Sequence, residues 1–276
     1  MSKYFYYTLF FIVFFQSCSE IPIEIKDIEI EPSEKVVLIE ELTGASCPNC
    51  PKGTAAINSI LAKYPKNVVA VGVHGKFLAE KTKDSKYDFR NKDAEDLENW
   101  FRPWFGKPTA SVNRVLNEDE LLTTDLPDLW LSMVEKELQK PQLVNMSMKV
   151  NYDTITRVAD IEVAYIPLTD LEGNYNTTVY VTESHIIDAQ SSNSEIIKNF
   201  EHNHVLREII TKFDGDFLVS NPRKNQIIKK NFSYTIPLST FPELFNPKHM
   251  AIIAMMSKSS AENKEVLQAI QQYVVK

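Results

Sequence analysis

Cys47 and Cys50, two cysteines three positions apart, are the residues of this chain whose type and spacing indicate chemistry. They stand at the start of a helix-like segment, where the first backbone N–H groups have no intrahelical partner and stabilise a thiolate. We therefore expect Cys47 to be the attacking sulfur and Cys50, further into the helix, to resolve a mixed disulfide. Pro48 suits the first helical position, because its missing N–H would have no partner there.

Three interpretations of this cysteine pair compete. A structural staple is disfavoured, because closing so small a loop removes little entropy from the unfolded chain. A zinc site would need two more ligands, and His202 and His204 have the wrong spacing for a zinc-finger pair; on a strand they would project to one face. We favour redox chemistry of the pair itself, and we expect neither a metal nor another cofactor.

The polypeptide elements around the pair predict how it is positioned. An apolar strand from Val36 to Leu42 precedes it, a helix runs from residue 48 to 64, and a second apolar strand covers residues 68–73. This β-α-β order implies a right-handed crossover and parallel strands. Residues 106–109 then precede a short strand, and a further amphipathic helix is predicted for residues 127–140.

This order of elements resembles the thioredoxin fold, because the Cys-x-x-Cys pair is followed later by Gly106-Lys107-Pro108-Thr109 before a strand. The resemblance covers residues 36–140. It implies a cis peptide bond before Pro108, which lies against the sulfurs, with Lys107 and Thr109 beside the substrate peptide. It also implies that Glu41 accepts a proton from Cys50. Ser46 and Pro48-Asn49 depart from the family pattern, so the family's redox potential does not carry over.

The segment between His74 and Gly106 is an insertion relative to that family. It is polar at first and then helix-like and aromatic, with Trp100, Phe101, Trp104 and Phe105. Two alternatives are open: the segment covers or widens the substrate site, or its aromatic side chains pack against the sheet.

Residues 141–276 change to alternating stretches separated by turns, which predict an all-β, sandwich-like domain with one helix-like interruption around residues 194–210. The two-part plan is similar to the Omp28-related outer-membrane lipoproteins of Bacteroides-type bacteria. The phrases at residues 201–207 and 266–269 carry the same resemblance.

The first 17 residues have the features of a secretory signal peptide, with Lys3 followed by an apolar run too short to span a bilayer. Phe15-Gln16-Ser17-Cys18 resembles a bacterial lipobox, so Cys18 is the predicted site of lipid attachment. The alternative is an ordinary signal whose cleavage leaves a stray cysteine. The odd cysteine count favours the lipid, because an unmodified Cys18 would be a reactive thiol in an oxidising compartment.

Composition restricts the classes of partner. Charged residues are 24% of the chain, the net charge is −7, and no basic cluster occurs, so nucleic-acid binding is not expected. No later apolar stretch approaches membrane length, so attachment would be by the anchor alone. Residues 18–35 are either an extended tether or an added edge strand.

The sequence therefore predicts a lipid-anchored thiol-disulfide oxidoreductase of the outer membrane or cell envelope, acting on cysteine-containing envelope proteins. The alternative is a non-catalytic envelope lipoprotein that binds a peptide, glycan or protein partner on a thioredoxin-like scaffold. Accessibility separates the two, because a redox enzyme needs an exposed Cys47.

Overall fold

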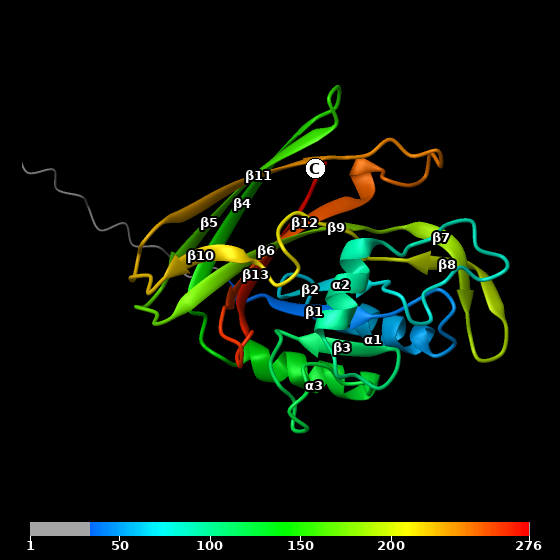
Figure 1. The fold of residues 1–276 in the computed structure, drawn as a ribbon, viewed down its shortest axis with the longest axis horizontal. Helices are drawn as coiled ribbons and strands as arrows, with labels where there is room; N and C mark the ends of the chain where they lie inside the picture. The colour runs from blue at the N-terminus through cyan, green and yellow to red at the C-terminus, as the bar shows by residue number, and fades with distance from the viewer. Residues whose placement is uncertain (1–33, 276) are drawn as a thin grey trace, which may run out of the picture. The chain divides into compact units, whose positions relative to one another are not determined.

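The computed structural model describes residues 34–275 and shows a mixed α/β protein (Figure 1). The predicted signal peptide, Cys18 and nearly all of the predicted 18–35 tether lie outside these residues. The described residues belong to one compact unit. Among them, no helix combines the length and the apolar character needed to cross a membrane.

The predicted β-α-β unit is confirmed by β1 (Val37–Leu42), α1 (Cys50–Lys63) and β2 (Val68–Val73). The two strands are parallel, and every residue of both is buried, as expected for central strands. The helix begins two residues later than predicted. Pro51 rather than Pro48 therefore lies in the first turn, where a proline removes no ladder hydrogen bond.

Three further elements complete the first region: α2 (Lys92–Trp100), β3 (Thr109–Val112) and α3 (Pro127–Leu138). β3 lies antiparallel to β1 on the side away from β2. Both faces of β1 are covered, because successive strand residues point to opposite sides. One face packs against α1 and α3, and the other packs against α2.

The aromatic residues of the predicted insertion mostly pack against the sheet. Phe101 is buried in the cluster that joins α2 to β1 and β2, and Trp100 and Trp104 pack against that cluster. Phe105 is the exception, with 81% of its surface exposed. Packing against the sheet is therefore the alternative that these side chains support.

Residues 144–273 form ten strands, in keeping with the predicted β-rich character of this region: β4 (Val144–Asp153), β5 (Val158–Pro167), β6 (Asn174–Glu183), β7 (Ile186–Ser191), β8 (Ile196–His202), β9 (Val205–Ile209), β10 (Asp216–Ser220), β11 (Ile228–Thr235), β12 (Met250–Lys258) and β13 (Val266–Tyr273). The helix-like interruption predicted for residues 194–210 is wrong, since β8 and β9 occupy it. The β-branched residues Ile196 and Ile197 suit a strand, and β8 pairs with β7.

The main sheet extends across the predicted domain boundary. Its strand order is β13-β12-β6-β9-β2-β1-β3. β10 lies outside this order and pairs with the first residues of β6. The contact between the two regions is parallel, with Gly72 of β2 opposite Val205 of β9. The Gly72 N–H also donates to the His204 carbonyl at 2.8 Å. Residue 140 thus separates two stretches of chain that share one sheet.

A second sheet, in the order β11-β5-β4, covers part of the main sheet. Its inward residues, such as Ile161 and Val163, share one buried cluster with Val179 of β6 and Ile252 of β12. The predicted alternation of inward and outward side chains explains this face-to-face packing.

A buried ion pair of the first region is joined to the second region by a tyrosine of the main sheet. The Arg114 guanidinium donates to both oxygens of Glu40 on β1, at 2.9 and 2.8 Å. The Tyr180 hydroxyl of β6 donates to the same carboxylate at 2.6 Å. Because both charges are fully buried, each needs the other as its partner.

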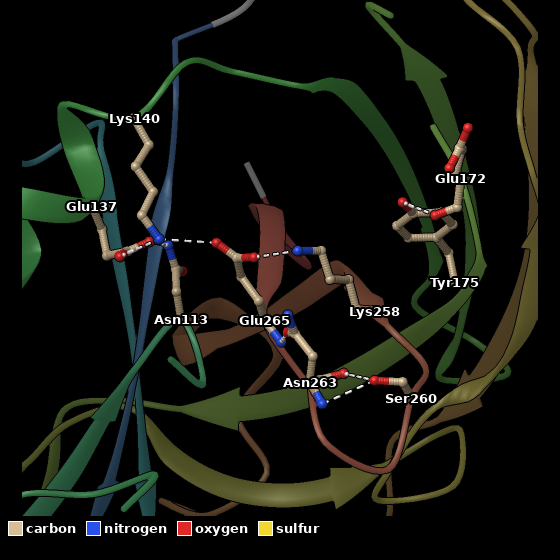
Figure 2. Close-up of polar contacts among 9 residues, drawn as sticks. All are labelled: Asn113, Glu137, Lys140, Glu172, Tyr175, Lys258, Ser260, Asn263 and Glu265. Atoms are coloured by element: carbon tan, nitrogen blue, oxygen red, sulfur yellow. Dashed lines mark hydrogen bonds and ion pairs between the residues drawn. The ribbon is translucent and has the colours of Figure 1, made fainter. Parts of the chain in front are cut away.

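A second polar junction lies where α3 ends beside the β12–β13 connection (Figure 2). The Lys140 ammonium lies 2.7 Å from Glu137 and 2.9 Å from Glu265, which also pairs with Lys258 at 2.7 Å. Asn113 donates to Glu137 in the same group, at 3.1 Å. These contacts fix the last turn of α3 against the C-terminal strands.

Candidate functional site

The two cysteines are joined as a disulfide at the start of α1. Cys47 lies in the turn before the helix, where its N–H donates to the Gly44 carbonyl at 3.1 Å, and Cys50 is the first helical residue. Neither is at the surface: the exposed fraction is 0% for Cys47 and 1% for Cys50. The exposed Cys47 that we expected of a redox enzyme is therefore not found in this arrangement.

Pro108 has the cis peptide bond that the resemblance implies. It lies against the beginning of α1, because a Cβ atom placed on Gly53 would be 2.8 Å from the Pro108 Cβ. Gly53 is one turn beyond Cys50. The absence of a side chain at Gly53 is thus what lets Pro108 approach this end of the helix.

Glu41 meets the same turn of α1 from β1. A Cβ on Gly53 would also collide with its Oε1 atom. The carboxyl group is buried and Oε1 has no hydrogen-bond partner. The Thr43 side chain forms a hydrogen bond with the carboxyl group. Burial raises the pKa of Glu41 to about 8, while the Lys107 charge and the Thr43 bond oppose this rise. Near neutral pH the group can hold or release a proton.

The other two predicted residues are buried in ways that the sequence did not suggest. The Lys107 ammonium lies 2.6 Å from Glu98 of α2 and donates to the Thr43 carbonyl at 2.8 Å. Burial lowers the pKa of Lys107, and Glu98 opposes this change. Thr109 is 1% exposed and pairs with Leu42 of β1. Neither side chain is at the surface for a substrate to contact.

The β7–β8 hairpin, residues 186–202, covers the disulfide. The Gln190 side-chain amide donates to the carbonyls of Gly44 and Cys47, at 3.1 and 3.0 Å. The Ser191 N–H donates to the Ala45 carbonyl at 2.8 Å. Figure 1 shows this hairpin projecting beyond the main sheet, on the side where α1 lies. The C-terminal region therefore closes the site that the N-terminal region builds.

Further contacts hold the hairpin in place. At its tip, Asn193 donates to the Asn49 side chain at 2.8 Å. Nearer its base, the Asp188 carboxylate accepts from the backbone N–H groups of Lys86 and Tyr87, at 2.9 and 2.8 Å. A small apolar cluster lies beneath it, made of Ala45, Tyr87, Phe89, Ile186, Val205 and Leu244.

A polar cavity of about 20 Å³ lies between α1, β2 and the hairpin. Glu41 lines it, and so do His74, Gln190 and His202; Nε2 of His202 is buried without a hydrogen-bond partner. Burial lowers the pKa of His202 to about 4 and that of His74 well below its usual value, so both rings are neutral near pH 7. His202 and His204 do not share a strand, because β8 ends at His202 and β9 begins at Val205.

An open groove of about 760 Å³ runs along another face of α1. It is lined by the disulfide-loop residue Asn49, by Lys52 and Ser59 of the helix, by Pro108, and by Asp125 and Asp128 before and within α3. Pro108 therefore borders this groove.

Sequence reasoning missed the covering hairpin, Gln190 and Glu98. Gln190 and Glu98 lie in stretches without a motif, and each acts on the site through long-range contacts. His202 was noticed, but as one half of a histidine pair rather than as a neighbour of Glu41. No local pattern in the chain signals these encounters.

Solved structures similar to the chain include the following two. One is HBP35 of Porphyromonas gingivalis, with a TM-score of 0.69 and 20% identity over 89% of this chain and 77% of that one. The other is a crystallised protein of Agrobacterium tumefaciens, with a TM-score of 0.55 and 11% identity over 89% of this chain and 97% of that one. At such identities the likeness shows the fold alone. No curated protein matches the sequence.

A protein-family comparison matches residues 98–276 to the outer membrane protein Omp28 family. The match includes Pro108 and the hairpin but begins after both cysteines. It confirms the resemblance stated from the sequence, and the family name points to the outer membrane or cell envelope. Because more than half of the chain is matched, this protein belongs to the Omp28 outer membrane protein family.

Proposed function

We propose that this protein is a thiol-disulfide oxidoreductase of the cell envelope, with a thioredoxin-like N-terminal region and a sandwich-like C-terminal region. The observation that carries the proposal is the Cys47–Cys50 disulfide at the start of α1, with cis-Pro108 and buried Glu41 against the next turn. This grouping supplies a nucleophile, a resolving thiol and a proton acceptor at one end of one helix.

The reaction follows from the two positions. In the reduced protein, the Cys47 thiolate attacks a substrate disulfide, so a Cys47–substrate bond forms and the other substrate sulfur leaves with the electron pair and takes a proton. Cys50 then passes its proton to Glu41 and attacks the Cys47 sulfur. The protein disulfide forms, the first substrate sulfur leaves as a thiolate, and the substrate has gained two electrons. The reverse sequence oxidises a substrate dithiol.

Access to Cys47 requires the hairpin tip to move. The contacts that seal the disulfide come from Gln190, Ser191 and Asn193, close to the turn between β7 and β8. Asp188 and the apolar cluster lie nearer the base and need not move. Lifting the tip would open Cys47 toward the groove beside Pro108, where Lys107 and Thr109 would face the substrate through their backbone.

The proposal includes the predicted anchor and partners. Cleavage after residue 17 and lipid attachment to Cys18 would place the protein on a membrane, facing exported proteins that contain cysteines. A Cys18→Ala variant should then lose its membrane attachment and fail to incorporate a fatty-acid analogue.

Trapping of covalent partners tests the redox activity. Cys50→Ser should leave Cys47 able to attack but unable to release, so mixed disulfides with envelope proteins should accumulate. Cys47→Ser is the matched control and should trap almost nothing. If Cys50→Ser traps no partner and the purified wild type neither reduces nor oxidises a test disulfide, the redox proposal is wrong.

A second candidate rests on two specific observations: Cys47 is fully buried, and the family match begins beyond the cysteines. Both suit a non-catalytic envelope protein that binds a peptide, glycan or protein partner on this scaffold. In that case the double variant Cys47→Ser/Cys50→Ser should retain the protein's role in the cell.

A further inference from the structure

A small cavity lies between Glu41 and the base of the β7–β8 hairpin. Oε1 of Glu41 and Nε2 of His202 are both buried and have no hydrogen-bond partner within the described structure. Both residues line the same cavity of about 20 Å³. A cavity of this size holds one water molecule, and buried water typically satisfies polar atoms that the protein leaves unpaired.

The chemistry of the two groups is complementary. His202 forms a hydrogen bond with the backbone of Ala189, which leaves Nε2 as the free acceptor of the neutral ring. Glu41 retains a proton near neutral pH, so its carboxyl group can donate. One water can accept from Glu41 and donate to His202.

We propose that His202 is a positioning residue for the thiol chemistry: through one water in this cavity, which it binds as an acceptor, it holds the Glu41 carboxyl group that takes the proton from Cys50. This inference rests on the proposed function. When Cys50 attacks the mixed disulfide, its proton goes to the ionised form of Glu41, and the neutral carboxyl group that results donates to the water, which in turn donates to Nε2 of His202. No other reactant is needed, and the proton is returned to solvent afterwards.

The surrounding charges fit this direction of transfer. Asp188 on β7 faces His202 and favours its protonated form, whereas His74 after β2 lies 6.0 Å away between ring centres. Lys107, paired with Glu98 of α2, faces Glu41 and favours its ionised form. Arg207 of β9 lies near His74. Burial outweighs Asp188 and lowers the pKa of His202 to about 4, so the ring stays neutral and Nε2 stays an acceptor, while Lys107 favours the Glu41 carboxylate that takes the proton.

The position of His202 in the hairpin allows transfer while substrate is bound. His202 pairs with Ile186 at the base, whereas the contacts that cover Cys47 come from the tip. The tip can therefore lift for a substrate while His202 stays beside the cavity.

The test follows one turnover of reduced protein with glutathione disulfide at pH 7, quenched with acid and resolved by mass spectrometry. His202→Phe should slow the conversion of the glutathione adduct into the Cys47–Cys50 disulfide by about tenfold, less than the roughly hundredfold or more that an acid–base group itself contributes. His202→Gln keeps an acceptor oxygen and should restore most of the rate. Ile57→Val, which trims an apolar wall of the same cavity, is the matched control and should not slow this step.

A double-mutant cycle tests whether His202 acts through Glu41. In a Glu41→Gln background, His202→Phe should cause no further slowing, because the carboxylate that takes the proton is already gone. An equal tenfold loss in both backgrounds, or no loss in either, overturns the positioning role of His202. Glutathione needs no natural partner, so the test of His202 can fail while partner trapping succeeds, and the reverse.

A structural readout is independent of any rate. A crystal structure of the wild type should show one ordered water within hydrogen-bond distance of both Glu41 Oε1 and His202 Nε2, and His202→Phe should lose it. A wild-type cavity without this water contradicts the proposal, even if His202→Phe proves too unstable to assay.

Discussion

The two sides of α1 differ in what they offer a partner. Toward the hairpin, the disulfide is sealed by hydrogen bonds from Gln190 and Ser191, and the cavity that Glu41 lines there has a volume of about 20 Å³. Toward Pro108, the same helix borders an open groove of about 760 Å³. On the hairpin side the buried Glu41 can hold a proton, and on the Pro108 side there is room for a polypeptide.

This difference teaches that chemistry and access are supplied by different parts of the chain. The charged and polar groups behind the disulfide come from strands of the main sheet and from α2, where burial fixes their positions. The cover comes from a hairpin that reaches over from the C-terminal region. Substitutions of the buried polar groups should therefore change the stability of the protein, and substitutions in the hairpin should change the accessibility of the disulfide.

The largest effect is expected from removing the buried cation behind the site. Lys107→Met would leave Glu98 buried without its partner, which typically costs about 3–5 kcal/mol in the free energy of unfolding. Denaturant unfolding followed by circular dichroism measures this loss. In Lys107→Met/Glu98→Gln the orphaned charge is also gone, so a double variant as unstable as the single one would contradict this account.

The next effect concerns the close approach of α1 to Pro108 and Glu41. Gly53→Ala should destabilise the protein by about 1–3 kcal/mol, because the new Cβ would collide with Glu41 and crowd Pro108. Gly106→Ala is the matched control, since a Cβ there meets nothing within 4 Å. Equal thermal midpoints for the two alanine variants would show that the helix can move away at no cost.

Glu41 should make the closed side sensitive to pH. Its pKa is raised from 4.5 to about 8, so the folded state holds a proton that the unfolded state releases above pH 4.5. Its contribution is fully present below that pH and is lost as the pH rises toward 8, at up to about 1.4 kcal/mol per pH unit. Relative to Glu41→Gln, the wild type should lose stability across this interval; parallel pH curves would exclude a raised pKa.

The smallest effect is expected at the cover. Gln190→Ala/Asn193→Ala removes three hydrogen bonds that hold the hairpin tip over the disulfide, so a phosphine reductant should reduce Cys47–Cys50 about tenfold faster, given about 0.5 kcal/mol, the low end for such bonds, for each of the three. Ser194→Ala lies in the same turn without contacting the disulfide loop and should leave the rate unchanged. An unaltered rate in the double variant would mean that the tip already opens freely.

The sequence predicted well those features that depend on local pattern. The apolar runs of β1 and β2 and the helical spacing between them identified the β-α-β unit, and the order of motifs led to the cis bond before Pro108. In the C-terminal region, alternation predicted strands but not their partners. Ile196, Ile197 and Phe200 fit a helical face as well as a strand, and only pairing with β7 decides between them.

The remaining features depend on contacts between residues far apart in the chain. Gln190 reaches Cys47 across 143 positions, and Tyr180 reaches Glu40 across 140. Lys107 was expected near a substrate, but the insertion supplies Glu98 as its partner and draws the side chain inward. Pairings of this kind leave no spacing signal, because each partner sits in an otherwise ordinary stretch.

The insertion of β9 beside β2 has a consequence for how the chain folds. β2 pairs along one edge with β1, which is close by in sequence. Its other edge pairs with residues near Val205, far along the chain, and β9 in turn pairs with β6. Until β9 pairs with it, β2 presents unpaired N–H and C=O groups along an apolar strand, the kind of edge to which other chains add. Such distant pairing also slows folding. Chain synthesised only as far as residue 140 is therefore expected to be a substrate for chaperones rather than a folded domain.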